Sequence, residues 1–433
     1  MFTIKMRNES LRDIICGFLI KDTWKSLTSC DILLYRHDNN CGYVYNGKAY
    51  AHLVDSLGDL LINHSLKVKS VARPLSILTG ERAYNCPVSF HQHYIIFAVM
   101  QQFIKIFKGT QNSLEWEKQQ RVTLWSSILK KANPGIVISI QPDDFLCQAG
   151  NGLGIPVYDL QHGVISDVHP WYGAKYRIDT PTEMLPTGFL CWDDHSVATL
   201  SKWAVQKGIR VVRIGNPWFL RFMIANQNDI LVQDIIPASE SWDEVRPSIL
   251  VSLQWGLMDI YEDVPNGVMI ESLENVILET YDQYNWVLRL HPVQLRDENE
   301  LELAKSYLIS TFGAEITNKW INDSFLPLPL VLRKVDLHIT YDSSIVIEAA
   351  WGGIRSGILN PRIKDADSFE SYYVHERSLG IAEVIPQDSD LIKQWIIHTL
   401  AKGRAEPTMD TSGEELDAFI NEIVEMCKNR NHE

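Results

Sequence analysis

Short apolar runs alternate with amphipathic stretches along this chain, and the pattern predicts parallel sheets with helical crossovers. In the first half the predicted strands lie at 30–35, 134–140, 155–160, 187–192 and 211–214. Amphipathic segments at 143–152 and 194–207 predict helices between them. Together these elements predict a doubly wound α/β domain.

A second set of strands and helices follows the polar, proline-bearing segment 237–247, the best candidate for a linker. The elements predicted after it are strands at 248–253, 286–292, 335–340 and 357–359 and helices at 271–283 and 412–428. We therefore expect two Rossmann-like domains that face each other across a cleft. Their predicted limits are 1–240 and 241–400, with a C-terminal helix in 401–433 that packs back on the first domain.

Composition narrows the class of protein. The 433 residues exceed what one hydrophobic core usually serves, and 45% hydrophobic with 22% charged residues is typical of a globular chain. A formal charge of −14 argues against nucleic-acid binding. The seven cysteines form no CxxC pair and no metal-binding spacing, and neither a signal peptide nor a long apolar run stands out. We expect a cytoplasmic protein with reduced thiols.

Two adjacent serines, Ser343 and Ser344, stand where the predicted strand 335–340 gives way to an apolar stretch ending at Gly352 and Gly353. The glycine pair suits a helix stop, so the serines are predicted to begin a helix. Unpaired N–H groups and the positive end of the helix dipole favour an anion there, and the hydroxyls add donors. The expected ligand is a phosphate; the alternative is that one serine only caps the helix.

Arg289 and His291 lie two residues apart in the predicted strand 286–292 and therefore share one face of it. Pro292 ends the strand and keeps the backbone of His291 extended, at the strand end where open α/β sheets bind ligands. A guanidinium and an imidazole there suit a phosphate or a carboxylate. A histidine before proline also fits a structural role, but the serine pair in the same predicted domain favours ligand binding.

In the first half, Gln161, His162 and Gly163 directly follow the predicted strand 155–160. We expect Gly163 to permit a positive φ or a close backbone approach, which leaves His162 at the carboxyl end of the sheet, facing the cleft. The alternative is an ordinary turn. Two histidines from two domains predict a ligand held between them, with one imidazole on the phosphate and the other near the reacting group.

The segments 161–163, 289–292 and 340–344, with Glu348, resemble the QHG, HP and SS motifs of bacterial GT-B glycosyltransferases of capsule and lipopolysaccharide assembly. Kdo transferases and polysialyltransferases, which use CMP-activated acidic sugars, are the most similar in these motifs. The resemblance spans most of residues 130–360 and leaves the first 120 residues without a counterpart. It implies a GT-B fold and transfer of an ulosonic sugar such as Kdo or sialic acid from a CMP donor to a glycan.

The resemblance implies that His291 and the serine pair hold the donor phosphate, and that Glu348 contacts the ribose or base. The donor-binding residues that we expect are Arg289, His291, Pro292, Ser343, Ser344, Glu348 and Gln254. Glu348 falls one helical turn after Ser344, on the same face. The expected partners are this donor and a glycan or lipid-linked glycan acceptor, with no nucleic acid; peripheral contact with the inner membrane or with other polysaccharide-assembly proteins is left open.

Two departures from the families bear on the substrate. The acidic-acidic-Gly triplet that supplies the base in sialyltransferases of this type does not occur, which disfavours sialic acid. The segment 335–344 also resembles the Asp-Tyr-Ser-Ser pattern of CDP-glycerol polyol-phosphate transferases, but Tyr341 precedes Asp342 here. A UDP-sugar transferase or epimerase, a CDP-glycerol-type transferase and a binding-only relative are the alternatives.

The candidates for the group that activates the acceptor are Asp143, Asp144, Asp259 and His162. Each of the two adjacent aspartates also fits a helix cap. The donors around the phosphate are expected to carry the charge of the leaving group, and no DxD-type motif stands out, so we expect neither a metal nor a cofactor beyond the donor.

Overall fold

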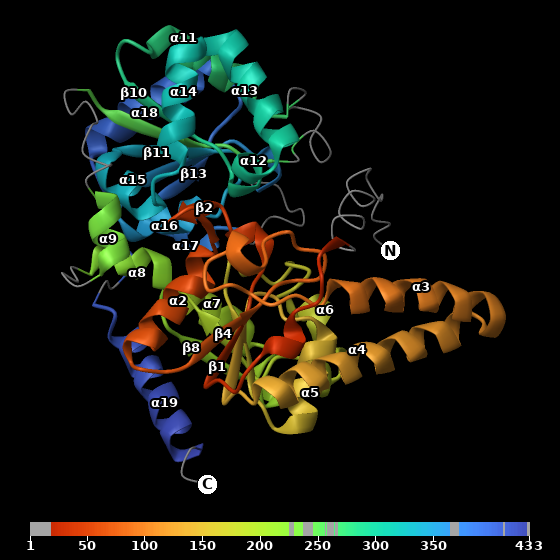
Figure 1. The fold of residues 1–433 in the computed structure, drawn as a ribbon. Coiled ribbons are helices and arrows are strands. Elements are labelled where there is room, and N and C mark those ends of the chain that lie inside the picture. Colours follow the sequence, from red (N-terminus) through yellow and green to blue (C-terminus); the bar gives the residue numbers. More distant parts are fainter. Residues whose placement is uncertain are drawn as a thin grey trace. The chain divides into compact units, whose positions relative to one another are not determined.

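The computed structural model describes residues 19–224, 229–236, 246–255, 257, 264, 267–363, 372–409 and 412–430. Most of the predicted linker 237–247 and the candidate Asp259 lie outside these ranges. The chain forms two compact units (Figure 1): unit 1 comprises 1–162, 176–217 and 414–433, and unit 2 comprises 163–175 and 218–413. These limits differ from the domain limits predicted from the sequence, which stay a prediction.

Unit 1 is built on a six-stranded sheet whose strands pair in parallel in the order β4-β1-β5-β6-β7-β8. The strands are β1 (Ile32–Tyr35), β4 (Val68–Val71), β5 (Ile136–Ser139), β6 (Val157–Leu160), β7 (Gly188–Cys191) and β8 (Arg210–Arg213). Every residue of β1, β5, β6 and β7 is buried, as expected for parallel strands covered on both faces. The prediction missed only β4, whose Val-Lys-Ser-Val sequence is short and half polar.

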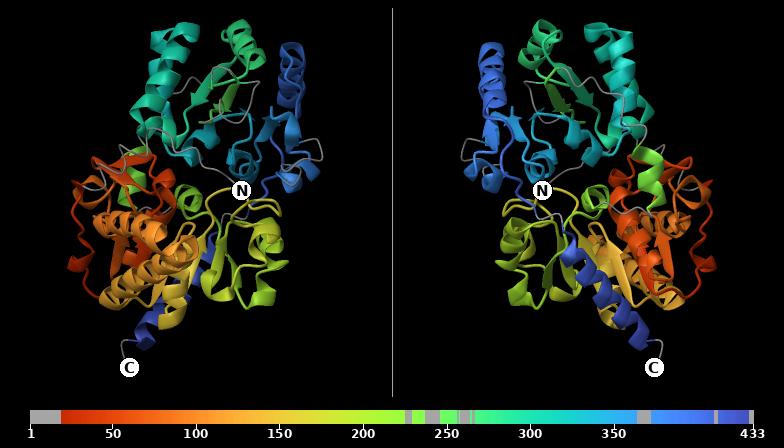
Figure 2. Two further views of the ribbon diagram at one scale, coloured as in Figure 1. Left: turned by 90° about the vertical axis from the view of Figure 1, so that its right-hand side faces the viewer. Right: turned by 90° about the vertical axis from the view of Figure 1, so that its left-hand side faces the viewer.

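Helices connect these strands and cover the sheet (Figure 2). The helices of unit 1 are α2 (His52–Asn63), α3 (His91–Lys108), α4 (Thr110–Ala132), α5 (Asp144–Leu153), α7 (Asp194–Ser201) and α19 (Glu414–Arg430), while α6 (Ala174–Arg177) crosses between the units. The sequence-based prediction did not include α2, α3 or α4. A hairpin, β2 (Tyr43–Tyr45) and β3 (Lys48–Tyr50), turns at Asn46 and Gly47, both with positive φ as a two-residue turn requires.

The C-terminal helix α19 packs within unit 1. Its Phe419 ring stands 6.0 Å from the Tyr158 ring, and Glu422 accepts a bond from Arg210. Its buried side chains are Leu416, Phe419, Ile420, Ile423 and Cys427. The helix therefore contributes an apolar stripe to the core of this unit.

Unit 2 contains a five-stranded parallel sheet in the order β10-β9-β11-β12-β13. The strands are β9 (Ser248–Ser252), β10 (Asn285–Arg289), β11 (Leu337–Thr340), β12 (Arg355–Ile358) and β13 (Ala382–Val384). The helices are α8 (Pro217–Met223, beginning at the last residue of unit 1), α9 (Ile230–Ile235), α11 (Glu271–Thr280), α12 (Pro292–Arg296), α13 (Glu298–Phe312), α14 (Ala314–Ser324), α15 (Leu328–Lys334), α16 (Ile345–Trp351), α17 (Val374–Ser378) and α18 (Ser389–Lys402). An apolar cluster of buried side chains joins the strands to α11, α14 and α18.

The predicted α/β class with two Rossmann-like sheets is confirmed. One detail was wrong: the predicted strand 286–292 ends at Arg289, and His291 begins α12 instead of continuing the strand. Pro292 occupies the first helical position, where its missing N–H is harmless, so the proline begins a helix two residues after the strand has ended.

Candidate functional site

The sheet order of unit 2 creates a topological switch point between β9 and β11. The chain runs outward from β9 to β10 on one side and to β11, β12 and β13 on the other. In open α/β sheets the loops at the carboxyl ends of the strands separate at this point and leave room for a ligand. The segments of interest are therefore those that follow β9, β11 and the neighbouring β10.

The loops after β9 and β11 are joined by the side-chain amide of Gln254. Its Oε1 accepts the backbone N–H of Asp342 at 2.9 Å, and its Nε2 donates to the carboxylate of Asp342. The hydroxyl of Thr340 donates to the carbonyl of Ser252 at 3.0 Å and accepts the N–H of Ser343 at 3.2 Å. Gln254 was predicted to bind the donor; in this geometry its amide positions the loop that precedes the serine pair.

Asp342 is held from its other side as well. Asn360, after β12, donates from Nδ2 to the carboxylate at 2.8 Å, and the Tyr373 hydroxyl donates to the backbone carbonyl at 2.5 Å. The Thr340–Ser344 turn is thus fixed by groups from several loops at the same edge of the sheet.

The loop after β10 joins this network through Gln294. The N–H of His291 donates to Oε1 of Gln294 at 2.8 Å, and Nε2 of Gln294 donates to the carbonyl of Gln254 at 3.2 Å. Nδ1 of His291 accepts the N–H of Val293 at 3.1 Å, which completes a capping box at the start of α12. A continuous set of hydrogen bonds therefore connects the three loops that carry His291, Gln254 and Ser343.

These contacts also set the protonation of His291. Burial, with a smaller contribution from Arg296, lowers the pKa of the imidazole to about 4, so the ring is neutral at physiological pH. Because Nδ1 accepts a hydrogen bond, the single ring proton is on Nε2. His291 therefore presents a neutral N–H donor, with the indole of Trp255 beside it at 6.4 Å between ring centroids.

The serine pair precedes the seven-residue helix α16. The hydroxyl oxygen of Ser343 accepts the N–H of Ile345 at 3.3 Å, and the side chain of Ser344 makes no capping bond. Both serines are half-buried. The cap is thus provided by Ser343, and the hydroxyl of Ser344 has no part in holding the helix.

Behind the serines, Glu348 is buried in the first turns of α16 with 8% of its surface exposed. Burial raises the pKa of its carboxyl to about 8, opposed by the charge of Arg289, which is equally buried. Arg289 also donates a long bond of 3.5 Å to the carbonyl of Asp323. The charge of Arg289, at the end of β10, therefore acts on the carboxyl of Glu348 in α16.

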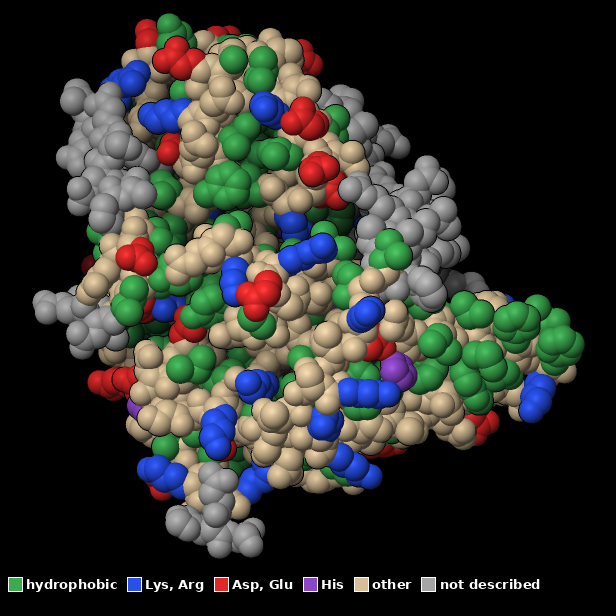
Figure 3. All heavy atoms as spheres, viewed as in Figure 1, with side chains coloured by type: hydrophobic (Ala, Val, Ile, Leu, Met, Phe, Trp, Pro, Cys, Tyr) green, Lys and Arg blue, Asp and Glu red, His purple; other side chains and the backbone are tan. Residues whose placement is uncertain are grey.

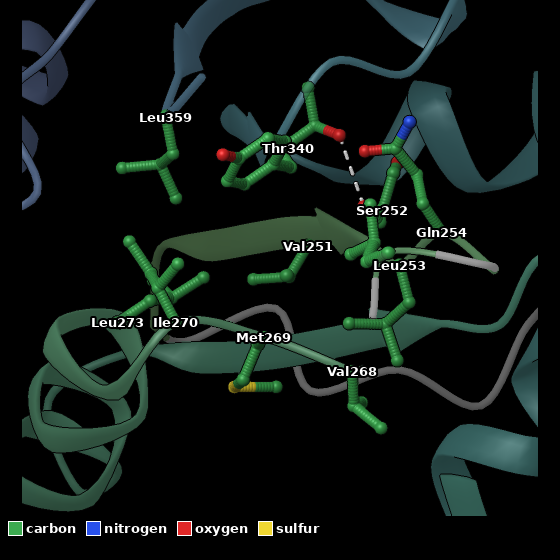
Figure 4. Close-up of a pocket in the computed structure, with 12 residues that line it drawn as sticks. Val251, Ser252, Leu253, Gln254, Val268, Met269, Ile270, Leu273, Thr340 and Leu359 are labelled. Carbon is green, nitrogen blue, oxygen red and sulfur yellow. Dashed lines mark hydrogen bonds between the residues drawn. The ribbon is translucent and has the colours of Figure 1, made fainter. Parts of the chain in front are cut away.

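An apolar pocket opens beside this edge, between the ends of β9 and β11 and the start of α11 (Figure 4). Its interior is small, about 20 Å³, which is about the room that one water molecule needs. Its lining residues are Val251, Ser252, Leu253, Gln254, Leu257, Val268, Met269, Ile270, Leu273, Thr340, Tyr341 and Leu359. Figure 4 shows that Thr340 and Gln254 come close at one side, while aliphatic side chains line the rest.

In unit 1, His162 follows β6 and is half-buried. Its ring stacks at 6.2 Å and 23° on the ring of His37, which follows β1, and Arg73, which follows β4, donates to Nε2 of His37. The carboxyl edge of this sheet therefore gathers two imidazoles and a guanidinium. His37 and Arg73 were missed, because the sequence gives no sign that β1 pairs with β5 and that β4 pairs with β1.

The two residues that flank His162, Gln161 and Gly163, differ in their surroundings. Gln161 is buried, accepts the N–H of Trp192 at 2.8 Å and donates to the Ser196 hydroxyl at 3.0 Å, so it ties β6 to the end of β7. Gly163 has no positive φ, and no heavy atom lies within 4 Å of the place its Cβ would take, so that prediction was wrong. The chain passes from unit 1 to unit 2 between His162 and Gly163.

Asp143 and Asp144 begin α5. Asp143 caps the helix by accepting the N–H of Leu146 at 2.8 Å and also accepts from the indole of Trp125 at 3.2 Å. Burial raises the pKa of both carboxyls, and Asp144 lies 3.7 Å from Arg177. These contacts fit the helix-cap alternative for Asp143; a role as base stays a prediction for both, as it does for Asp259.

One buried histidine was not among the residues predicted from the sequence. His338, in the middle of β11, bridges the hydroxyls of Ser252 and Ser356 at 2.9 Å each, and burial lowers its pKa to about 3. These two bonds join β11 to β9 and to β12.

Across the described ranges no group of three or more His, Cys, Asp or Glu side chains is arranged to hold a metal ion. Within the same ranges no helix has the length and apolar character to cross a membrane.

No protein-family model matches the chain, and no curated protein matches it significantly. Solved structures do match. UDP-GlcNAc 2-epimerase from Neisseria meningitidis bound to UDP-GlcNAc shares 13% identity over 91% of this chain and 99% of its own, with a TM-score of 0.54. The wall teichoic acid polymerase TagF with CDPG shares 12% over 98% and 96%, with a TM-score of 0.53. The S. aureus MnaA–UDP structure shares 12% over 91% and 95%, with a TM-score of 0.51. The chain therefore has the α/β fold of GT-B enzymes.

Proposed function

We propose that this chain is a nucleotide-sugar enzyme, a glycosyltransferase, that binds the nucleotide of its donor at the carboxyl edge of the sheet in unit 2. The phosphate is bound by His291, Ser343 and Ser344. Arg289 and Glu348 lie behind these residues, with Glu348 assigned to the ribose or base. The acceptor is a glycan or lipid-linked glycan of a bacterial surface polysaccharide.

The hydrogen-bonded link from His291 through Gln294 and Gln254 to Asp342 carries this proposal. It brings the HP and SS segments, about fifty residues apart in sequence, to neighbouring strand ends at the switch point. A neutral Nε2–H donor and serine hydroxyls suit an anionic phosphate, since they bind it without requiring a proton to be taken up. Such a cluster stabilises negative charge that develops on a departing nucleotide.

For the donor we propose a CMP-activated acidic sugar such as Kdo, with sialic acid less favoured because the acidic-acidic-Gly triplet does not occur. The HP and SS motifs support this assignment. The donor phosphates need no divalent metal in this proposal, because protein donors carry the charge.

A second candidate is a UDP-sugar enzyme, either a transferase or an epimerase, and a third is a polyol-phosphate transferase. The observation that favours the second is the likeness in fold to a UDP-GlcNAc 2-epimerase bound to UDP-GlcNAc and to MnaA bound to UDP. The third is favoured by the likeness to TagF with CDPG. The donors of all three candidates contain a pyrimidine nucleotide, and they differ in the group that is attached to it.

On the acceptor side we assign His162 to the reacting group, with Asp143, Asp144 and Asp259 as the other candidates for the base. His162 is supported by its place at the carboxyl end of β6 and by the neighbouring His37 and Arg73. An imidazole whose ring is held by stacking keeps its orientation, which general-base catalysis requires.

Two assays separate these functions. A thermal-shift screen over CMP, CDP, UDP, GDP and dTDP identifies the nucleotide, because a ligand that binds only the folded state raises its melting temperature. Incubation with the matching nucleotide sugar then identifies the reaction: a transferase slowly releases free nucleotide, whereas an epimerase interconverts the sugars without nucleotide accumulation. A larger shift with UDP than with CMP would replace the first candidate by the second, and no shift with any nucleotide would refute all three.

A further inference from the structure

A stripe of exposed apolar side chains runs along α3, the first helix of the α3–α4 hairpin. The stripe consists of Ile96, Val99, Met100, Phe103, Ile106 and Phe107, spaced three or four residues apart or adjacent, as one helix face requires. The exposed fraction rises toward the end of the helix, from about half at Ile96 (51%) to 75% at Ile106 and 80% at Phe107.

The opposite face of α3 is already occupied. Tyr94 stacks under the guanidinium of Arg121 at 4.2 Å, and the ring of Phe97 meets the ring of Trp116 at 6.1 Å. Gln101 donates to Glu117 on α4. These contacts hold α3 against α4, so the apolar stripe lies on the face that α4 does not cover.

The hairpin extends away from the sheet of unit 1 (Figure 1). The buried residues that α4 adds to the core, such as Trp125, Ile128 and Leu129, lie in its final turns. In Figure 3, apolar side chains gather over the outer end of the hairpin. A contiguous exposed apolar patch of this kind is typical of an interaction surface.

The charges around the stripe indicate its partner. The chain carries a net charge of −14, yet residues 91–132 of the hairpin contain six Lys and Arg against two acidic residues, Glu115 and Glu117. Two exposed lysines, Lys105 and Lys108, adjoin Ile106 and Phe107 in sequence at the outer end of α3, on the side of the helix that carries Gln101. Aromatic and aliphatic side chains on one face and an excess of basic residues are the features of helices that lie in the interface of an anionic membrane.

We propose that the α3–α4 hairpin docks on the surface of a membrane that contains anionic lipid. The side chains of Phe103, Ile106 and Phe107 enter the boundary between headgroups and acyl chains, and Lys105 and Lys108 contact lipid phosphates. A second copy of the chain is a poorer partner, because another hairpin carries the same excess of basic side chains. This proposal does not depend on the nucleotide site in unit 2.

The test is co-sedimentation of the full chain with vesicles of phosphatidylcholine alone and of phosphatidylcholine with phosphatidylglycerol. We expect binding to the anionic vesicles, weakened by salt. Ile106→Ser/Phe107→Ser should lower the partition coefficient at least about tenfold, because two large apolar side chains no longer leave water. Leu391→Ser/Ile397→Ser, which removes two exposed apolar side chains from α18 in unit 2, is the matched control and should bind like wild type.

Further measurements distinguish the lipid from other partners. Lys105→Gln/Lys108→Gln should reduce the preference for anionic vesicles, and circular dichroism should show unchanged melting because these side chains are exposed. The proposal is overturned if the wild type stays in the supernatant with both vesicle types, or if Ile106→Ser/Phe107→Ser binds as well as wild type. A dimer in lipid-free sedimentation velocity that dissociates in Ile106→Ser/Phe107→Ser would identify the stripe as a contact between copies and would equally overturn it.

Discussion

The two ring nitrogens of His291 serve different purposes. Nδ1 caps α12 by accepting the N–H of Val293, and this contact leaves the proton on Nε2, where the proposed phosphate is bound. A single substitution to alanine removes both functions at once. Separating them requires a side chain that can still cap a helix, and asparagine is among the best caps.

We therefore expect His291→Asn and His291→Ala to lower nucleotide affinity alike, by about ten- to a hundredfold, as loss of a hydrogen bond to a charged group predicts. Only His291→Ala should also lose stability, by about 0.5–2 kcal/mol, because it removes the cap. Calorimetric titration and thermal melting of both variants check this. Unchanged affinity in His291→Asn would show that the imidazole does not contact the nucleotide.

Glu348 makes the stability of the protein depend on pH. Its pKa is raised to about 8 by burial, against an ordinary value of 4.5. Between these two values the folded state keeps a proton that the unfolded state releases, so its contribution to stability is present at low pH and is lost as pH rises toward 8.

Glu348→Gln removes this titration. The melting temperature of the variant minus that of wild type should therefore increase as the pH is raised from about 5 to about 8. Melting curves of both proteins at matched pH values and ionic strength provide the measurement. A difference between the two melting temperatures that does not change with pH would contradict the raised pKa.

At the scale of elements, the site depends on which strand ends are neighbours. The alternation of apolar runs predicts most strands of both sheets, and Pro292 and the serines mark the ends of two of them. The sheet order, and with it the contacts of Gln254 with Asp342 and of His37 with His162, depends on pairings between distant segments that local sequence does not encode. For the same reason Gly163 was misjudged: its conformation depends on the surrounding chain.

The link between the loops after β9 and β11 gives an element-scale prediction. Gln254→Ala should lower nucleotide affinity although the amide is assigned no contact with the ligand, because the Thr340–Ser344 turn loses a fixing contact. Hydrogen exchange of residues 340–345 should be faster in the variant than in wild type, and calorimetry gives the affinity. Asn151→Ala, which breaks a side-chain bond to the carbonyl of Glu183 in unit 1, is the control. If exchange is faster but affinity is unchanged, the turn does not bind the nucleotide.

At the scale of the whole molecule, we propose that unit 2 binds the donor nucleotide and that His162 in unit 1 acts on the reacting group. His162→Asn should therefore reduce turnover much more than nucleotide affinity, as happens when an interaction forms mainly in the transition state. His398→Asn, an exposed histidine on α18, should leave both unchanged. A stable His162→Asn protein with full turnover would remove His162 from the reaction, and a lower melting temperature with proportional loss of activity would indicate a structural histidine.

The most direct test of the central claim is calorimetric titration of the nucleotide selected by thermal shift into wild type and into Ser343→Ala/Ser344→Ala. The account predicts saturable binding to wild type and an affinity about ten- to a hundredfold weaker in the variant, because hydroxyl donors to a charged phosphate are lost. Melting should change little, since Ser344 makes no capping bond and Ser343 makes one long bond at 3.3 Å. Equal affinity in the two proteins would contradict the assignment of the phosphate to this edge of the sheet.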